Sequence, residues 1–309
     1  MRIAFMGTPD FSVKCLEALI QSGNEVGLVV TQTDKAKDRG KKVQFTPVKE
    51  LALRHGIKVL QPEKIKKNEE FFEELKSYAP DLIVVVAYGK IIPKEVLDLP
   101  KYGCINVHAS LLPKLRGASP IQHAIVNGET VTGVTIMQMA EGLDTGDMLT
   151  KESIEIGNMN FEELHDALAD IGSKLLVKTI PMIENGTVKP EKQDDRLSNY
   201  AGMISKQDGK IDFAKEPEVI ERLIRGFDPW PGAFCDYNGT VMKLWRAEPL
   251  TGEFEGEKGE IIFVDNNSFT VKCGGGALKV TEIQMPGKKR VKVSDYLRGN
   301  KVDTGSVLK

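Results

Sequence analysis

Cysteine is scarce in this sequence and widely spread. The four cysteines, Cys15, Cys104, Cys235 and Cys273, form no C-x-x-C pair and have no histidine at zinc-ligand spacing. This spacing excludes a disulfide scaffold and a zinc ribbon. We therefore expect reduced thiols, no bound metal and a cytoplasmic location.

Long hydrophobic runs and a strong net charge are also lacking. No apolar run approaches the roughly 20 residues that cross a bilayer, and a strand-like run begins at residue 2, where a signal peptide would need its charged start. The formal net charge of −2 gives no global attraction to nucleic acid. We expect a monomer with no membrane partner, and a polyanion would have to meet local basic patches.

Glycine is too sparse after the first strand for a dinucleotide fingerprint. That fingerprint needs G-x-G-x-x-G directly after the strand, and the chain has Gly7-Thr8-Pro9-Asp10-Phe11 there. A G-x-x-x-x-G-K-[ST] loop for nucleoside triphosphates is absent as well. Neither cofactor class is therefore predicted.

Up to about residue 155 the sequence alternates between short apolar runs and helix-like segments, which predicts a parallel sheet flanked by helices. The predicted strands are 2–7, 25–31, 58–62, 81–89, 103–108 and 133–139. The predicted helices are 11–22, 46–55, 68–78, 119–127 and, further on, 160–184. This is a Rossmann-like doubly wound α/β domain, whose site lies at the carboxyl ends of the strands.

The pattern changes after about residue 190. A polar connection leads to one more predicted helix, 216–226, and then to short alternating runs separated by turn residues, which predict a small antiparallel β-barrel. We expect a catalytic domain at 1–189, a linker at 190–206 and a C-terminal domain at 207–309.

The stretch NVHASLLPKLRG places two polar residues at the end of a predicted strand. Asn106 and His108 share one strand face, so both side chains can enter one cavity. An amide N–H can stabilise an oxyanion and an imidazole can move a proton, which suits acyl transfer to an amine. Taken alone, such a pair is more often structural.

An acid for this pair is available in the segment MQMAEGLDTGDML. Asp144 lies in a glycine-flanked loop directly after a predicted strand, where α/β enzymes place catalytic groups. Asp147 is the competing choice, and either aspartate could instead be a turn former. The conjunction with Asn106 and His108 favours a catalytic role for Asp144.

Two segments are rich in basic residues. One is the loop TQTDKAKDRGKK, which contains Lys35, Lys37, Arg39, Lys41 and Lys42. The other is the tail, which from Lys279 onward has eight Lys or Arg against three Asp or Glu and includes GKKRVK. Each could be a solvated surface, but the loop's position at the carboxyl end of a strand favours phosphate contact.

The central motifs carry a resemblance. NVHASLLPKLRGASPIQHAIVNGE and TGVTIMQMAEGLDTGDML are similar to the signature of the folate-dependent formyltransferases. The opening MRIAFMGTPDF, the basic loop, IRGFDPWPGAF and the tail KVTEIQMPGKKRVKVSDYLRG resemble the branch of that family that acts on initiator methionyl-tRNA. The resemblance covers nearly the whole chain and implies a formyltransferase fold with a C-terminal, OB-like, tRNA-binding domain.

The resemblance also implies roles. Asn106, His108 and Asp144 match the catalytic triad, and Ser110, Leu111, Leu112 and Pro113 match the element beside the site of 10-formyltetrahydrofolate, the co-substrate. Arg39 matches an arginine that enters the acceptor-stem end of the tRNA. The expected tRNA-binding residues are Lys35, Lys37, Arg39, Lys41, Lys42, Lys288, Lys289 and Arg290.

The basic loop departs from the family's commoner sequence. Thr33 and Ala36 replace prolines and Asp38 replaces a glycine, so we expect a more flexible loop with one unhelpful charge. Three alternative functions remain at this point. They are a formyltransferase acting on a sugar-nucleotide amine, a hydrolase releasing formate, and a tRNA-binding protein without catalysis. The two basic segments argue against the first and second.

Overall fold

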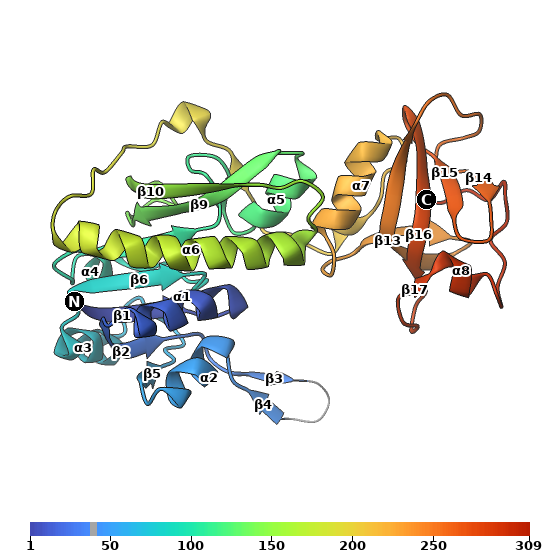
Figure 1. The fold of residues 1–309 in the computed structure, drawn as a ribbon. Coiled ribbons are helices and arrows are strands. Elements are labelled where there is room, and N and C mark those ends of the chain that lie inside the picture. The colour runs from blue at the N-terminus through green and yellow to red at the C-terminus, as the bar shows by residue number, and fades with distance from the viewer. Residues whose placement is uncertain (38–41) are drawn as a thin grey trace. The chain divides into compact units, whose positions relative to one another are not determined.

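The chain folds into two compact units (Figure 1). A computed structural model describes residues 1–37 and 42–309, with the side chains of 1–34 and 44–309. Unit 1 comprises 1–120, 131–155 and 165–202, and unit 2 comprises 121–130, 156–164 and 203–309. Among the described helices, none combines the length and apolarity that crossing a bilayer requires.

Unit 1 is built on a seven-stranded sheet in the order β10-β9-β7-β6-β1-β2-β5. The strands are β1 (Arg2–Gly7), β2 (Glu25–Val30), β5 (Lys58–Leu60), β6 (Leu82–Val86), β7 (Cys104–His108), β9 (Val131–Gln138) and β10 (Met148–Glu155). The ladders from β5 to β7 are parallel, whereas β9 runs antiparallel to β7 and β10. This confirms the predicted α/β class with a mainly parallel sheet.

Two helices lie side by side on one face of this sheet (Figure 1). They are α1 (Asp10–Gln21) and α6 (Phe161–Glu184), joined by a 2.7 Å hydrogen bond between the Lys14 ammonium and Asp170. A Cβ atom at Gly172 of α6 would lie 3.1 Å from Val107, so α6 packs closely on the Val107 face of β7. The neighbouring side chains of β7 therefore point to the opposite face.

The opposite face carries a large hydrophobic core. Ala4, Met6, Ile83 and Val85 pack there with side chains of α3 (Glu69–Tyr78) and α4 (Lys94–Leu97). Cys104 of β7 belongs to the same cluster, so the alternating residues Asn106 and His108 continue along this face towards the carboxyl end of the strand.

The remaining helices of the first 130 residues are α2 (Pro47–Arg54) and α5 (Pro120–Val126). The start of α2 follows from its sequence, because the Thr46 side chain accepts a hydrogen bond from Lys49 N and Pro47 occupies the first helical position. The α3 helix begins in the same way after Asn68, whose side chain accepts from Phe71 N.

Unit 2 contains α7 (Pro217–Gly226), α8 (Val293–Tyr296) and an antiparallel six-stranded sheet. Of these, α7 and the antiparallel character of the sheet agree with the prediction for the C-terminal part. Its strands are β12 (Ala233–Tyr237), β13 (Thr240–Thr251), β14 (Ile261–Val264), β15 (Phe269–Lys272), β16 (Gly276–Gln284) and β17 (Val291–Lys292). Register shifts on either side of Arg246 interrupt the β13–β16 ladder, which is a way for a long strand to bend.

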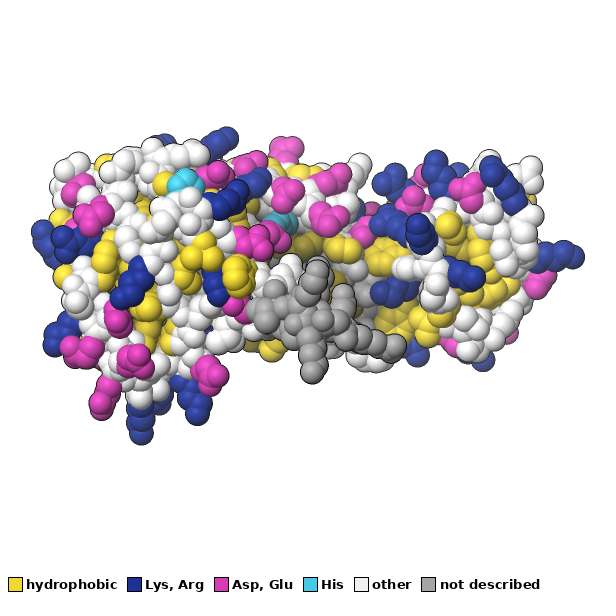
Figure 2. All heavy atoms as spheres, turned by 90° about the horizontal axis from the view of Figure 1, so that it is seen from below, with side chains coloured by type: hydrophobic (Ala, Val, Ile, Leu, Met, Phe, Trp, Pro, Cys, Tyr) yellow, Lys and Arg dark blue, Asp and Glu magenta, His cyan; other side chains and the backbone are white. Residues whose placement is uncertain are grey.

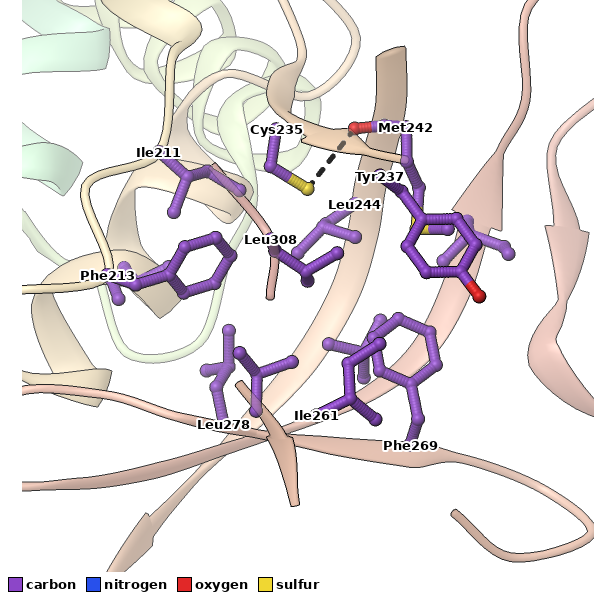
Figure 3. Close-up of a cluster of buried hydrophobic side chains, with 14 of the residues drawn as sticks. Ile211, Phe213, Cys235, Tyr237, Met242, Leu244, Ile261, Phe269, Leu278 and Leu308 are labelled. Carbon is purple, nitrogen blue, oxygen red and sulfur yellow. Dashed lines mark hydrogen bonds between the residues drawn. The ribbon is translucent and has the colours of Figure 1, made fainter. Parts of the chain in front are cut away.

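The core of unit 2 gathers aliphatic and aromatic side chains from the sheet and the segments beside it (Figure 3). Leu244, Phe269 and Leu278 are fully buried, and the Cys235 thiol lies 3.7 Å from the Met242 carbonyl oxygen. Leu308, next to the end of the chain, is also buried in this cluster.

The structure adds elements that the sequence pattern did not predict. They are the short pair β3 (Lys35–Lys37) and β4 (Lys42–Gln44), β10, β12, β17, α4, α8 and a two-residue pair of β8 (Arg116–Gly117) with β11 (Tyr200–Ala201). Residues 165–202 pack as part of unit 1. The division at 1–189, 190–206 and 207–309 remains our proposal for the domains of the chain.

We expect the four thiols to be unreactive in the folded protein. All four are buried, and burial raises the pKa of Cys15, Cys104, Cys235 and Cys273 to about 12, so the reactive thiolate is absent at pH 8. Ellman's reagent should label none of them in the native state and all four in denaturant. Rapid native labelling would contradict this assignment.

Candidate functional site

The predicted polar pair lies at the carboxyl end of β7. Asn106 is paired in the sheet with Val85 and Met137, and His108 is paired with Thr135. His108 is 5% exposed and Asn106 is half-buried. The structure thus places both side chains on one strand face at an edge where α/β folds carry their sites.

The Ser-Leu-Leu-Pro corner follows this strand and is fastened to β9. Thr135 accepts a hydrogen bond from Leu112 N at 3.1 Å and donates one to the Ser110 carbonyl at 2.7 Å. The Ser110 hydroxyl donates to the Lys114 carbonyl at 2.7 Å. Ser110 and Leu112 are buried, and Leu111 and Pro113 are half-buried.

The orientation of His108 follows from a single contact. Its Nε2 atom lies 3.0 Å from the Leu115 carbonyl oxygen. A carbonyl can only accept, so Nε2 carries the proton in this contact. The other ring nitrogen, Nδ1, faces Asp144 Oδ2 at 3.7 Å and is the atom that can gain or lose a proton.

Asp144 lies in the loop between β9 and β10, in a left-handed backbone conformation with φ 51° that aspartate tolerates better than most residues. Its side chain is 13% exposed, and Oδ2 accepts a 2.8 Å hydrogen bond from Gly117 N. Among the described residues, Asp144 and not Asp147 reaches ion-pair distance of His108. Asp147 lies where the chain returns to the sheet, and its carbonyl accepts from Gln138 N.

Gly117 is required by the geometry of this contact. It has φ 118°, and a Cβ atom there would lie 2.6 Å from the Ala201 carbonyl oxygen. A larger residue would push β8 away from β11 and shift the N–H group that Asp144 accepts from.

Two residues of the polar connection reach this site and were missed by sequence reasoning. Gln193 donates to the carbonyl of Asp144 at 2.8 Å, and Asn199 accepts from Leu115 N at 2.5 Å. Thr135 was missed as well. Nothing in the sequence around Gln193 or Asn199 sets them apart from ordinary loop residues.

The arrangement can stabilise an oxyanion and move one proton. An amide donor, an imidazole and a carboxylate lie in a largely buried place, where electrostatic interactions are stronger than in water. Across the described parts of the chain, no group of three or more His, Cys, Asp or Glu side chains is arranged to hold a metal ion.

Exposed apolar side chains flank the loop that carries Asp144. Ile91 is 89% exposed and Leu143 is 57% exposed, on two segments that meet where Lys94 Nζ lies 3.8 Å from Glu141. A cleft of about 670 Å³ lies beside this contact, and its lining residues include Leu97 and Met139. Charged side chains, among them Lys94, Asp98 and Glu141, also line this cleft, so it is not an apolar site.

The predicted basic loop is described only at its base. Arg39 and Lys41 lie outside the described residues, as do the side chains of Lys35, Lys37 and Lys42. The backbones of 35–37 and 42–44 pair as antiparallel strands.

Three polar side chains stand at the base of this pair. Asp34 accepts from Lys49 and, at 2.9 Å, from Gln61, which also accepts from Lys49 at 2.6 Å. Burial raises the pKa of Asp34, but the hydrogen bonds from Lys49 and Gln61 outweigh this and hold the pKa below its usual range. Asp34 therefore stays charged at neutral pH and fixes the start of the basic loop.

The basic tail contains two kinds of cation. Lys288 and Lys289 are exposed, and Figure 2 shows Lys and Arg side chains on the right-hand, C-terminal part of the visible face. Arg290 instead makes 2.7 Å contacts with Asp228 and Glu282, and its guanidinium lies over the Trp245 ring. Its charge is therefore balanced inside unit 2, which makes Arg290 a weaker candidate for phosphate contact than the two lysines.

Family models match both parts of the chain. One described as "Formyl transferase" matches residues 1–180, and one described as "Formyl transferase, C-terminal domain" matches residues 203–301. Among solved structures, an N-formyltransferase from Helicobacter canadensis, in complex with folinic acid and dTDP-3-aminofucose, has a TM-score of 0.67. The alignment covers 90% of this chain and 97% of that one at 23% identity, which indicates a shared fold.

Curated relatives are far more similar in sequence. A methionyl-tRNA formyltransferase from Clostridium acetobutylicum is 53% identical over 310 residues, covering 100% of both chains. Another from Caldanaerobacter subterraneus is 50% identical, again over 100% of both. Identity at this level over the full length, together with the two family models, shows that the chain belongs to the methionyl-tRNA formyltransferase family.

Proposed function

We propose that this chain transfers the formyl group of 10-formyltetrahydrofolate to the α-amino group of methionine carried by initiator tRNA, for translation initiation. The observation that carries the proposal is the pairing of His108 Nδ1 with Asp144 Oδ2 across 3.7 Å, beside Asn106 on the same strand face. That geometry occurs in a chain whose full-length relatives are named for this reaction.

Three side chains supply the chemistry. The amine attacks the formyl carbon, and Asn106 donates its amide N–H to the oxygen that becomes negative. His108 can also donate there, but only through Nδ1 and only when protonated, because Nε2 is bound to Leu115. Asp144 receives the proton that the attacking amine loses. The bond between the formyl carbon and N10 of the folate then breaks, and the departing nitrogen takes up a proton, so that tetrahydrofolate leaves neutral at N10 and no net proton is gained or lost.

Burial of His108 and Asp144 keeps these steps away from bulk water. The donor is an amide-like N-formyl group, so the Asn106 amide and a protonated His108 suffice to stabilise the oxyanion. The amine must already be neutral when it attacks, because Asp144 takes up only the proton that the nitrogen loses afterwards.

The residues beside the site fit a folate donor. A pterin ring is flat and partly apolar, and the exposed Leu143, the neighbour of Asp144 in the chain, offers it apolar surface. The corner from Ser110 to Pro113 lies directly after His108 and supplies the opposite boundary of the site in our proposal.

For the tRNA we propose the basic loop, with Arg39 as its central residue, and the exposed Lys288 and Lys289 of the tail. These contacts rest on the sequence and its resemblance. We further propose that the chain acts as a monomer in the cytoplasm, where initiator tRNA is charged.

The deciding assay mixes the purified chain and 10-formyltetrahydrofolate with one acceptor at a time. Methionyl initiator tRNA should be formylated, and methionyl elongator tRNA should be used much less. An amino-sugar nucleotide, such as the dTDP-3-aminofucose in the Helicobacter canadensis complex, should not be used. A preference for the sugar nucleotide, or release of free formate only, would overturn the proposal.

Replacing His108 should remove catalysis and spare binding. We expect His108→Ala to lower the rate of formyl transfer by roughly 10²–10⁴-fold, because a positioned proton-transfer group contributes about that much. tRNA affinity and the thermal unfolding midpoint should change little. Unaltered formyl transfer would show that His108 is not a catalytic residue, whereas a parent chain that binds tRNA and transfers no formyl group would favour a tRNA-binding protein without catalysis.

Matched controls are available for this experiment. His55→Ala replaces an exposed histidine of the same unit and should be neutral. Asp144→Asn keeps the side-chain size and an oxygen for Gly117 N but loses the charge, so it should resemble His108→Ala. Asp147→Asn should retain activity, and a loss there equal to that of Asp144→Asn would exchange the roles of the two aspartates.

Arg39→Ala should weaken the use of tRNA. If Arg39 contacts phosphate, the variant should raise KM for methionyl-tRNA and lower the slope of log affinity against log salt by about 1, with formyl-folate affinity unchanged. Arg54→Ala, an exposed arginine of α2, is the matched control. Loss of folate affinity in Arg39→Ala would show that the loop has another role.

A further inference from the structure

The segment 191–201, here called the strap, lies along the loops of the candidate site. At one end, Glu191 exchanges two backbone hydrogen bonds of 2.8 Å with Met148, the first residue of β10. At the other end, Tyr200 and Ala201 pair in parallel with Arg116 and Gly117. Both anchors belong to unit 1, so the polar connection follows this unit closely before the chain enters unit 2 at residue 203.

Gln193 holds the loop that carries Asp144. Its amide nitrogen donates to the carbonyls of Asp144 at 2.8 Å and Gly146 at 2.7 Å. Its amide oxygen accepts from the Arg116 guanidinium at 2.9 Å, and Arg116 makes a further 2.8 Å contact with Asp195 of the strap. The three hydrogen bonds of the Gln193 side chain described here thus join the strap to the loop that carries Asp144 and to Arg116, which precedes Gly117.

Asn199 holds the residue that orients His108. Its side-chain oxygen accepts from Leu115 N at 2.5 Å, and its backbone carbonyl accepts from Arg116 N at 3.0 Å. Leu115 has a left-handed backbone with φ 58°, a conformation that costs energy for a branched apolar residue and persists only when neighbouring bonds enforce it. The carbonyl oxygen of Leu115 accepts the hydrogen bond from His108 Nε2.

Gln193 and Asn199 act on different members of the His108–Asp144 pair. Gln193 fixes the Asp144 backbone, while Asn199 fixes Leu115 and, through it, the ring of His108. Between them, β8 supplies Gly117 N to Asp144. The 3.7 Å separation of His108 Nδ1 from Asp144 Oδ2 is therefore set from both sides by the strap.

We infer that the strap is part of the catalytic apparatus and that Gln193 and Asn199 are positioning residues for formyl transfer. Gln193 acts as a donor to two carbonyls, and Asn199 acts as an acceptor from one N–H group. The kinetic consequences of this inference rest on the proposed function. Its structural consequences rest on the hydrogen bonds alone.

Two substitutions to carboxylates of similar size distinguish these roles. Gln193→Glu keeps an oxygen for Arg116 but turns the donor into an acceptor that faces two carbonyls, so kcat should fall by at least about tenfold. Asn199→Asp keeps the acceptor for Leu115 N, so kcat should stay within about twofold of the parent, while Asn199→Ala should lose about tenfold. KM for tRNA should change little throughout.

Lys189→Ala, an exposed residue just before the strap, is the control and should behave as the parent. Hydrogen exchange gives a readout that needs no substrate. Gln193→Glu should speed exchange in 139–147, and Asn199→Ala should speed it in 115–117, with the unfolding midpoint and the remaining exchange near the parent values. A general loss of protection would point to ordinary stabilisation of the fold and would overturn the inference.

The kinetic outcomes separate the inference from the proposed function. If the parent chain formylates methionyl-tRNA and Gln193→Glu matches it, or if Asn199→Asp is as slow as Asn199→Ala, the positioning roles are wrong. If the parent transfers no formyl group, the proposed function fails. The local exchange changes then still decide whether the strap holds the two loops.

Discussion

The hydrogen bond from Gly117 N to the Asp144 carboxylate is the contact on which the site depends. It joins the segment that follows β7 to the loop between β9 and β10, and so brings an acid to the histidine at the end of β7. A charged acceptor in a largely buried place makes this a strong hydrogen bond, and its loss would leave a carboxylate without its backbone partner. Leu115 and Asp144, which lie on the two segments that this hydrogen bond joins, both have a left-handed backbone conformation.

The central elements of unit 1 could be predicted because their sequences are periodic or uniformly apolar. β6, for example, is the run LIVVV and is buried at all five positions. Edge elements were missed for the converse reason. β10 has the sequence MLTKESIE and is largely exposed beyond its first residue, so its alternation is weak, and β3 and β4 are short and rich in lysine.

The residues of the candidate site also fall into those that the sequence could predict and those that it could not. Asn106, His108 and Asp144 could be predicted because their residue types and their places at strand ends point to one chemistry, and a recognisable motif surrounds them. Gln193 and Asn199 could not, because each acts through backbone groups that the fold brings together over 49 and 84 residues. The ion pair of Arg290 could not be predicted either, since the aspartate that it contacts lies 62 residues away, and its expected contact with tRNA stays a prediction.

The strap also determines where the catalytic part of the chain ends. A fragment ending at residue 189 would contain the whole of α6 and the three residues of the triad, but it would lack every side chain of the strap that fastens their loops. A fragment ending at residue 202 would keep them, at the expense of 13 further residues with little apolar content. On the inference drawn above, the part of unit 1 that the site requires therefore extends past the end of α6 at Glu184 to residue 201.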